Sequence, residues 1–460
     1  MRWLKRLAAC MVVASVSSVA VNTQLPNPST AVLYEGARMI IGDGNAPIEN
    51  GAFVVQNGQI TAVGRRGAVP APAGARRVDL TGKTVMPALV NVHAHVGYEK
   101  FINVEGEARP ENFTPQNILD HLQREAFYGV GTVLDAGSAE IAISQQFQLD
   151  TVARKFPPAA QFVLMAGVVP PDGGPDHILI KGTRPLRASF EVTRSPEARA
   201  AVQAIAAKNI KHLKIWLGDR NGTYPAMPHE VYDAVIDEAH KHGILVHAHA
   251  TNLRDQKDAL RAGVDLIVHS IQNAKFDDEL VALVREKKPY WTTVMGLGDR
   301  SAVCDNDPFF TQALRPATVA DIRATNCKPN PNAATREENL KYNFMRMIDS
   351  GARLVLGTDA GVWPRYTFGS ADHHELARYV QLGLTPAQAI EAATSRAAEL
   401  TGVKDVGKLG QGMRADFLVL DATPLEDIRN TRQIASVYLR GSMLDRNALL
   451  AQWKQTSTSP

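Results

Sequence analysis

The middle of the chain alternates short apolar runs with amphipathic segments. Eight of the apolar runs have the length and composition of strands, and segments between them, such as 227–243, place apolar residues at helical spacing. Strands that alternate with helices predict βαβ units and a parallel sheet. Eight such units predict an α/β fold of the (β/α)8 TIM-barrel type. The predicted strands span 85–95, 129–137, 161–169, 210–217, 243–250, 264–270, 289–296 and 352–360.

Both ends of the chain show a different pattern, in which short apolar runs are separated by turn residues. Asn57-Gly58 lies between two such runs and predicts a β-hairpin. Residues 415–421 and 434–444 near the other end have the same strand-like character. We therefore expect the two ends to form one small β-sandwich beside the barrel. The expected parts are 31–86 with 401–446 for the sandwich and 87–400 for the barrel.

The N-terminus has the pattern of a secretory signal peptide. Residues 1–6 are positively charged, 7–21 are apolar and small, and 18–20 form a small-x-small cleavage site. The apolar run of about 15 residues is shorter than the ~20 that span a bilayer, so we expect no stable membrane span. Removal of 1–20 would place the mature protein in the periplasm or outside the cell. A lipoprotein anchored through Cys10 is the alternative, but the apolar stretch follows that cysteine instead of preceding it.

Composition excludes several classes of protein. A hydrophobic content of 45% and a charged content of 21% over 460 residues are ordinary globular values, and three cysteines are too few for a disulfide-built scaffold. The net charge of +3 hints at an acidic partner. However, the first six residues contain three cations, and the first twenty contain no acid. The remaining chain is neutral by count, so no nucleic-acid partner is expected.

Residues with metal-binding side chains lie at the predicted strand ends. The active site of a TIM barrel lies at the carboxyl ends of its strands. The first predicted strand ends with two histidines that are two positions apart in the sequence, and strand alternation places both side chains on one face. One histidine pair is weak evidence, but six such residues at the ends of four strands predict a metal site. They are His93, His95, His247, His249, His269 and Asp359.

The fourth predicted strand carries a lysine on its inner face. Alternation places His212, Lys214 and Trp216 toward the barrel interior, while the aliphatic residues between them face the outer helices. A buried ammonium beside a cation site is costly. Carboxylation by carbon dioxide would convert Lys214 into a carbamate anion that can bridge two metals. The alternative is an ion pair between Lys214 and a carboxylate such as Asp359.

The ordered set of motifs resembles the amidohydrolase superfamily over nearly the whole mature chain. The matching segments are PALVNVHAH, HLKIW, LVHAHA, DLIVHS and LVLGTDAG, followed by GKLGQGMRADFLVLD. The branch that they resemble contains imidazolonepropionase-like proteins and metal-dependent Xaa-Pro dipeptidases (prolidases). The resemblance implies two divalent ions, most simply zinc. It assigns one ion to His93, His95 and Asp359 and the other to His247 and His269, with carboxylated Lys214 bridging. His249 is left either as a residue that supports a ligand or as a substrate contact.

The implied activity is hydrolysis by an exported binuclear metal-dependent amidohydrolase. A metal-bridging hydroxide would attack a carbonyl, and Asp359 would pass the proton to the leaving amine. Relatives that deaminate tend to carry a glutamate three residues after the fifth-strand histidine, where this chain has Ala250. An acyclic amide, in a dipeptide or an N-acyl amino acid, is therefore the preferred substrate. His177 and Tyr224 could bind its carbonyl oxygen, although ordinary loop roles are equally open for both.

Two alternatives remain at this stage. The same hydroxide could open a carbamate, a cyclic amide or a lactone, since fold does not fix the substrate. A periplasmic binding protein on a retained barrel is the non-enzymic alternative, but the complete ligand set argues against it. In either case the partner is a small carbonyl compound, and a homo-oligomer is compatible with the sequence.

The segment 296–340 is unusually long for a barrel loop and contains Cys304 and Cys327. Long segments at this face of a barrel are commonly functional lids. In an oxidising compartment the two cysteines could pair, and two free thiols are the alternative. We expect a disulfide here to stiffen one wall of the substrate pocket and to shape specificity.

Overall fold

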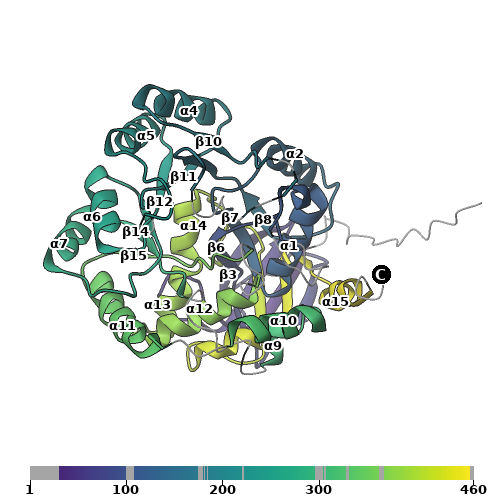
Figure 1. Cartoon of the computed structure of the whole chain (residues 1–460). Coiled ribbons are helices and arrows are strands. Elements are labelled where there is room, and N and C mark those ends of the chain that lie inside the picture. The colour runs from purple at the N-terminus through teal and green to yellow at the C-terminus, as the bar shows by residue number, and fades with distance from the viewer. Residues whose placement is uncertain are drawn as a thin grey trace, which may run out of the picture.

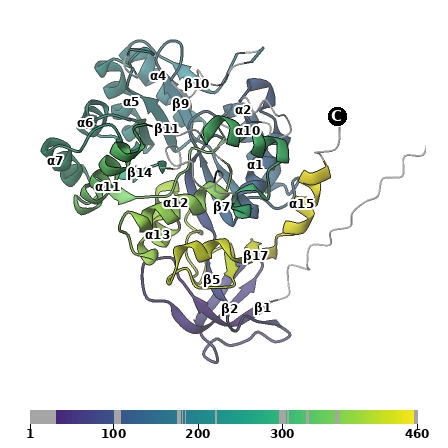
Figure 2. The same ribbon diagram turned by 60° about the horizontal axis from the view of Figure 1, so that its bottom comes forward.

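The computed structural model describes residues 31–99, 108–174, 180, 182–183, 185–219, 222–295, 304, 307–327, 331–361 and 367–455. The predicted signal peptide and His177 lie outside these residues. In the described part, helices ring a central set of strands, and a β-rich layer lies beneath them (Figures 1 and 2). No described helix combines the length and the apolar character needed to cross a bilayer.

Parallel strands form the wall of a barrel. One run of pairing joins β6, β7 and β8, and another joins β9 to β15 in chain order, apart from β10 at the outer edge of β9. The backbone N–H of Val92 donates to the carbonyl of Leu356 at 2.8 Å, and Ala94 bridges to Ala360, so the last strand meets the first. The predicted α/β barrel is confirmed. Its strands are β6 (Leu89–Ala94), β7 (Val130–Asp135), β8 (Gln161–Val163), β9 (Ala166–Val169), β10 (Ser189–Glu191), β11 (His212–Trp216), β12 (Leu245–His249), β13 (Leu266–Val268), β14 (Tyr290–Thr292) and β15 (Arg353–Leu354).

The third predicted strand, 161–169, is two strands in the structure. β8 pairs with β7, whereas β9 pairs with β11. Leu164 and Met165 lie between β8 and β9, and both are buried. The apolar run is therefore continuous in the sequence although the chain changes its pairing partner within it.

Helices follow most of the strands and cover the outside of the barrel (Figure 1). Leu213 and Ile215 on β11 pack outward into the same core as Val231 and Val235 of α5, as their alternation predicts. The α-helices are α1 (Pro115–Phe127), α2 (Ile141–Val152), α4 (Ser195–Ala207), α5 (His229–Lys241), α6 (Leu253–Ala262), α7 (Asp278–Lys287), α9 (Pro308–Thr311), α10 (Pro316–Asn326), α11 (Ala333–Asp349), α12 (Ser370–Gln381), α13 (Pro386–Ala392), α14 (Ser395–Thr401) and α15 (Arg446–Gln455). Two short 3-10 helices are η1 (Pro110–Asn112) and η3 (Ile428–Arg432).

A second sheet combines strands β1 to β5 with β16 to β18, from the two terminal parts of the described chain, and lies at the base of Figure 2. Its order is β18-β17-β16-β5-β1-β2-β3, with β4 also paired to β1. The predicted hairpin at Asn57-Gly58 is present, and both residues have positive φ (53° and 77°), as a tight hairpin turn requires. The strands are β1 (Val32–Met39), β2 (Ile48–Gln56), β3 (Gln59–Arg65), β4 (Arg76–Asp79), β5 (Thr84–Pro87), β16 (Phe417–Leu420), β17 (Ile434–Leu439) and β18 (Ser442–Met443).

An aromatic cluster holds the two chain ends together in this sheet. Tyr34 stacks on Phe53 at 4.9 Å and meets the edge of Phe417 at 5.3 Å, and Phe417 stacks on Tyr438 at 4.4 Å. Such pairs contribute about 0.5–1.5 kcal/mol each beyond the area that they bury. These contacts belong to a hydrophobic core of the sheet itself. This agrees with the predicted β domain made from both ends of the chain.

Cys304 and Cys327 form a disulfide, with their Cα atoms 5.7 Å apart. The bond closes a loop that contains α9 and α10. Of the two alternatives left open by the sequence, the structure contains the pair.

Candidate metal centre

Three predicted ligands meet where the first and last strands of the barrel end. His93 lies in β6, His95 follows that strand, and Asp359 lies five residues beyond β15. Asp359 Oδ1 is 3.2 Å from His93 Nε2 and 3.0 Å from His95 Nε2. All three residues are buried, and one donor atom from each lies within 4.8 Å of the other two. Two imidazole nitrogens and a carboxylate oxygen are donors that suit zinc and related divalent ions, so this group could hold a metal.

Several non-glycine residues at the strand ends near this group have a strained backbone conformation. Asp359 has a φ of +61°, and its N–H donates to the His93 carbonyl at 2.8 Å. His269 after β13 and Val294 after β14 also lie in the left-handed region, at +81° and +49°. Non-glycine residues adopt this conformation at a cost, and such residues gather at functional sites.

The environment gives His93 and Asp359 the protonation states in which such groups bind metals. Burial, and next the charge of Lys214, lower the pKa of His93 to about 3. Burial alone would raise the pKa of Asp359, but hydrogen bonds from His93 and His95 outweigh it and hold that pKa well below the usual range. The imidazole of His93 is therefore neutral and the carboxylate ionised at neutral pH, which are the forms that bind metals.

Lys214 on β11 is fully buried, as predicted. Its Nζ lies 3.5 Å from His93 Nε2 and 5.1 Å from the centre of the Trp216 ring. Gly137, with a φ of +88°, makes this packing possible, because a Cβ there would overlap the Cβ of Lys214. Parallel pairing aligns Lys214 with His247 on β12, so both face the barrel interior at the same level.

A chain of hydrogen bonds fixes the ring of His247. His212 Nε2 lies 3.1 Å from the Thr401 carbonyl, which can only accept, so this nitrogen carries the proton. Burial lowers the pKa of His212 to about 4, so its other nitrogen, Nδ1, is an acceptor. His212 Nδ1 lies 3.2 Å from His247 Nε2, which must therefore donate. The remaining nitrogen of His247, Nδ1, is a buried lone pair without a hydrogen-bond partner among the described residues.

The other predicted site residues lie at different distances from this group of three. The ring of His269 lies 6.0 Å from that of His93, and its Nε2 is 2.9 Å from His249 Nδ1. Among the described residues, only His93, His95 and Asp359 reach ion-binding spacing as a group of three. Tyr224 lies half-buried in the loop after β11, and its N–H donates to the Asp219 carbonyl at 3.0 Å. Its role as a substrate contact stays a prediction.

Sequence reasoning missed the residues that hold His95 in place. His95 Nδ1 lies 2.7 Å from Ser138 Oγ. Asp135 at the end of β7 accepts hydrogen bonds from the N–H groups of Gly137, Ser138 and Ala139 at 2.7 to 3.1 Å, which fixes the loop that carries this serine. Burial raises the pKa of Asp135 to about 6. Its position as an acidic residue at a strand end was the available signal.

A buried pair of carboxyl groups lies next to Asn91, the residue that supports the backbone of His93. Asn91 Oδ1 accepts from the His93 N–H at 2.9 Å, and Asn91 Nδ2 lies 3.5 Å from Glu125 Oε1. Glu125 of α1 faces Asp372 of α12. Burial, followed by the charge of Asp372, holds the pKa of Glu125 well above its usual range, and burial does the same for Asp372. At least one of these carboxyl groups therefore keeps its proton near neutral pH.

This pair should make stability depend on pH. The unfolded chain releases carboxyl protons near pH 4, whereas the folded chain keeps them to a higher pH, so the free energy of unfolding falls as the pH rises between those values. Asp372→Asn removes one such group. We expect its unfolding midpoint, relative to the unmodified protein, to rise between pH 5 and pH 8 in thermal denaturation. The exposed Asp349→Asn is the control, and an Asp372→Asn difference independent of pH would contradict the assignment.

The role of His212 predicts an effect on metal affinity. His212→Leu removes the acceptor that orients His247, whereas His212→Gln can still accept through its oxygen and donate to Thr401. Loss of such a supporting contact typically lowers metal affinity 10- to 100-fold. We expect this loss in titrations of His212→Leu with zinc, and near-normal affinity for His212→Gln and for the exposed control His242→Leu. Equal affinity for the Leu and Gln variants would refute the role.

Comparisons with known proteins fit this geometry. The chain is 26% identical over 415 residues to an imidazolonepropionase of Deinococcus radiodurans, covering 86% of this chain and 92% of the relative. It is 23% identical over 422 residues to a 5-methylthioadenosine/S-adenosylhomocysteine deaminase of Pelotomaculum thermopropionicum, covering 85% and 84%. The solved structure of a Xaa-Pro dipeptidase with bound methionine in the active site has a TM-score of 0.70 at 21% identity, covering 90% of this chain and 100% of that chain.

The family model described as "Amidohydrolase family" matches residues 84–444, which include the barrel and the later strands of the β domain. The similarity to an imidazolonepropionase and to a dipeptidase fold agrees with the branch predicted from the motifs. The ordered motifs, the barrel and the match over most of the chain show that the protein belongs to the amidohydrolase family of enzymes.

Proposed function

We propose that the protein is an exported binuclear metal-dependent hydrolase that cleaves the amide bond of a dipeptide or an N-acyl amino acid. The observation that carries the proposal is the buried group of His93, His95 and Asp359 beside the fully buried Lys214. A metal with a purely structural role would not need to lie at the carboxyl-terminal end of the barrel strands, where the loops leave room for a substrate.

The donor set fits two divalent ions. His93, His95 and Asp359 would hold the first, and His247 through Nδ1 with His269 would hold the second. Lys214 faces both groups, and its ammonium would repel the ions. Carboxylation, in which the neutral amine adds to carbon dioxide and releases a proton, would replace that cation with an anion able to bridge them. Bound divalent ions supply a polarised carbonyl and an activated water at neutral pH.

The protein side chains then handle the proton. Asp359 is ionised, buried and hydrogen-bonded by two imidazoles, so it is placed to accept a proton from the attacking water. Cleavage of the C–N bond requires that a proton reach the leaving nitrogen, and Asp359 can deliver it. His249, which contacts His269, is placed beside the second group of ligands and could bind the substrate.

Amide hydrolysis fits this site better than ring deamination does. Deamination of a heterocycle needs an acid that protonates a ring nitrogen, and the position expected for it holds Ala250, which is fully buried and apolar. The deaminase among the relatives therefore supports the chemistry of C–N bonds but not its own substrate. Carbamates, cyclic amides and lactones remain alternatives for the same site, because the attack on the carbonyl is the same.

Export is part of the proposal. The signal-peptide pattern at residues 1–20 indicates it, and the Cys304–Cys327 disulfide supports it, because such bonds persist mainly in oxidising compartments. N-terminal sequencing of the protein from the periplasm or culture medium should begin near residue 21. An intact N-terminus on protein from the cytoplasm would contradict export.

The mechanism is tested by metal content and turnover together. We expect close to two divalent ions per chain in the unmodified protein by elemental analysis, and far fewer in Lys214→Ala. Lys211→Ala, three residues earlier on an exposed position, is the matched control and should keep both ions. A screen of Xaa-Pro, Xaa-Arg and N-acyl amino acid substrates should give turnover that chelators remove.

Asp359→Asn should lower kcat on the best of these substrates by about 10²- to 10⁴-fold, the usual contribution of a general acid–base group. Turnover unchanged by both Lys214→Ala and Asp359→Asn would exclude the proposed mechanism. If the protein turned over a lactone or a carbamate but no amide, the assignment of the site would stand and the proposed substrate class would be wrong.

A further inference from the structure

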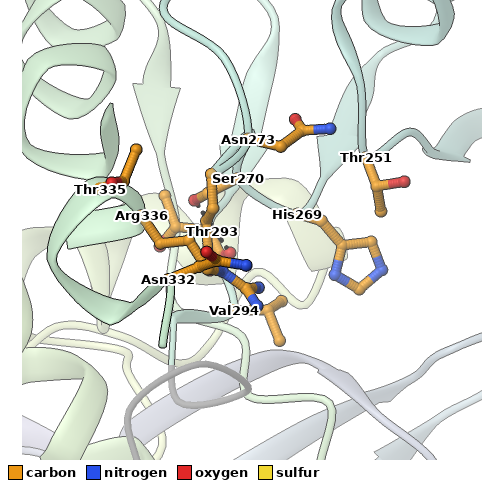
Figure 3. Close-up of a pocket in the computed structure, with 10 residues that line it drawn as sticks. Thr251, His269, Ser270, Asn273, Thr293, Val294, Asn332, Thr335 and Arg336 are labelled. Atoms are coloured by element: carbon orange, nitrogen blue, oxygen red, sulfur yellow. Dashed lines mark hydrogen bonds between the residues drawn. The ribbon is translucent and has the colours of Figure 1, made fainter. Parts of the chain in front are cut away.

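A cavity opens beside the second group of predicted ligands. It has a volume of about 530 Å³, within the range of small-molecule sites. His269 after β13 and Val294 after β14 line one part of it, and Arg336 in the first turns of α11 lines another (Figure 3). The two strand-end residues are those with strained backbones, so the cavity lies at the face of the barrel where substrates bind.

Several of the side chains that line the cavity are polar, and one of them carries a positive charge. Its lining offers hydroxyl and amide groups, including Ser270, Asn273 and Thr335, and the guanidinium of Arg336. No aspartate or glutamate is among the described residues that line it. A substrate group that enters this cavity therefore meets donors and one cation.

Arg336 is oriented but not neutralised. Its Nε donates to Gln272 Oε1 at 3.0 Å, and it forms no ion pair with any described carboxylate. The acids next to it on α11 are engaged elsewhere, since Glu337 pairs with Arg378 at 2.8 Å and Glu338 pairs with Lys275 at 2.6 Å. The bond through Nε leaves the two terminal nitrogens of the guanidinium for a further partner.

Helix α11 adds to this charge. The cavity is lined by Asn332 and Thr335 as well as Arg336, so it lies at the N-terminal end of a 17-residue helix. Partial positive charge collects at that end, and no acid occupies its first turn. Cys327, which forms the disulfide with Cys304, lies five residues before Asn332 in the sequence.

We propose that Arg336 binds a free carboxylate of the substrate. A guanidinium with two available nitrogens matches a carboxylate geometrically, and the described residues of this lining provide no anion to pair with it. The inference rests on the proposed function and identifies the substrate group that the site recognises. The preferred substrates are amides whose acid or amine part bears a carboxylate near the scissile bond, such as dipeptides and N-acyl amino acids, and not neutral amides.

A binding experiment tests this independently of turnover. The probes are N-benzenesulfonylglycine and N-(2-hydroxyethyl)benzenesulfonamide, in which a hydroxymethyl group replaces the carboxylate. Neither probe contains a carboxamide bond that an amide hydrolase could cleave. Calorimetry with the metal-loaded protein should show about 10- to 100-fold tighter binding of the carboxylate, the usual contribution of a charge-assisted contact. The preference should disappear in Arg336→Gln and return in part in Arg336→Lys. Arg346→Gln, on the same helix but outside the cavity, should keep it.

The outcomes of this experiment separate the assignment of Arg336 from the proposed function. Equal affinity for the two probes, or a preference that survives in Arg336→Gln, would overturn the assignment, the latter by placing the carboxylate on the metals or elsewhere. A carboxylate preference that depends on Arg336 in a protein without amidase activity would retain this site and refute the proposed function.

Reduction of the disulfide should weaken the preference for the carboxylate probe without removing the metals. Elemental analysis of the reduced protein checks the metal content.

Discussion

The closure of the barrel is the constraint on which the site depends. His95 and Asp359 are 264 residues apart in the chain, yet their donor atoms lie 3.0 Å from each other. This occurs because the segment that follows β15 forms hydrogen bonds with β6, from the Val92 N–H to the Leu356 carbonyl and from the Asp359 N–H to the His93 carbonyl. If that pairing shifted by one residue, the ligand side chains would turn to the other face of the wall. The strained φ at Asp359 is the cost of aiming its side chain at the two histidines.

Around this contact, the protein arranges partners that fix protonation and orientation. Ser138 supports His95, Asn91 supports the backbone of His93, and His212 directs the lone pair of His247 inward. These supports come from β6, β11 and the loop after β7, so the site is held from several directions. Such pre-organisation is what allows a catalytic ion to be bound in one geometry.

The sequence predicted the barrel and the inward placement of several candidate ligands because both follow from local rules. Alternation along β6 and β11 placed His93, His95 and Lys214 on the inner face, and the Asn57-Gly58 turn predicted its hairpin. The sequence did not predict the split at Leu164, the pairing of Glu125 with Asp372, or the place of Arg336. These depend on contacts between distant segments, and no local period marks them. Arg336 lies on an exposed helical turn that resembles any other solvated face.

The most direct test of the central claim is a crystal structure of the metal-loaded protein with anomalous scattering measured at the metal edge. The account predicts two peaks. One should lie about 2.0–2.2 Å from His93, His95 and Asp359, and the other near His247 Nδ1 and His269, with carboxylate density on Lys214 between them. A single ion with Lys214 as a free amine, or no ion at these residues, would contradict it.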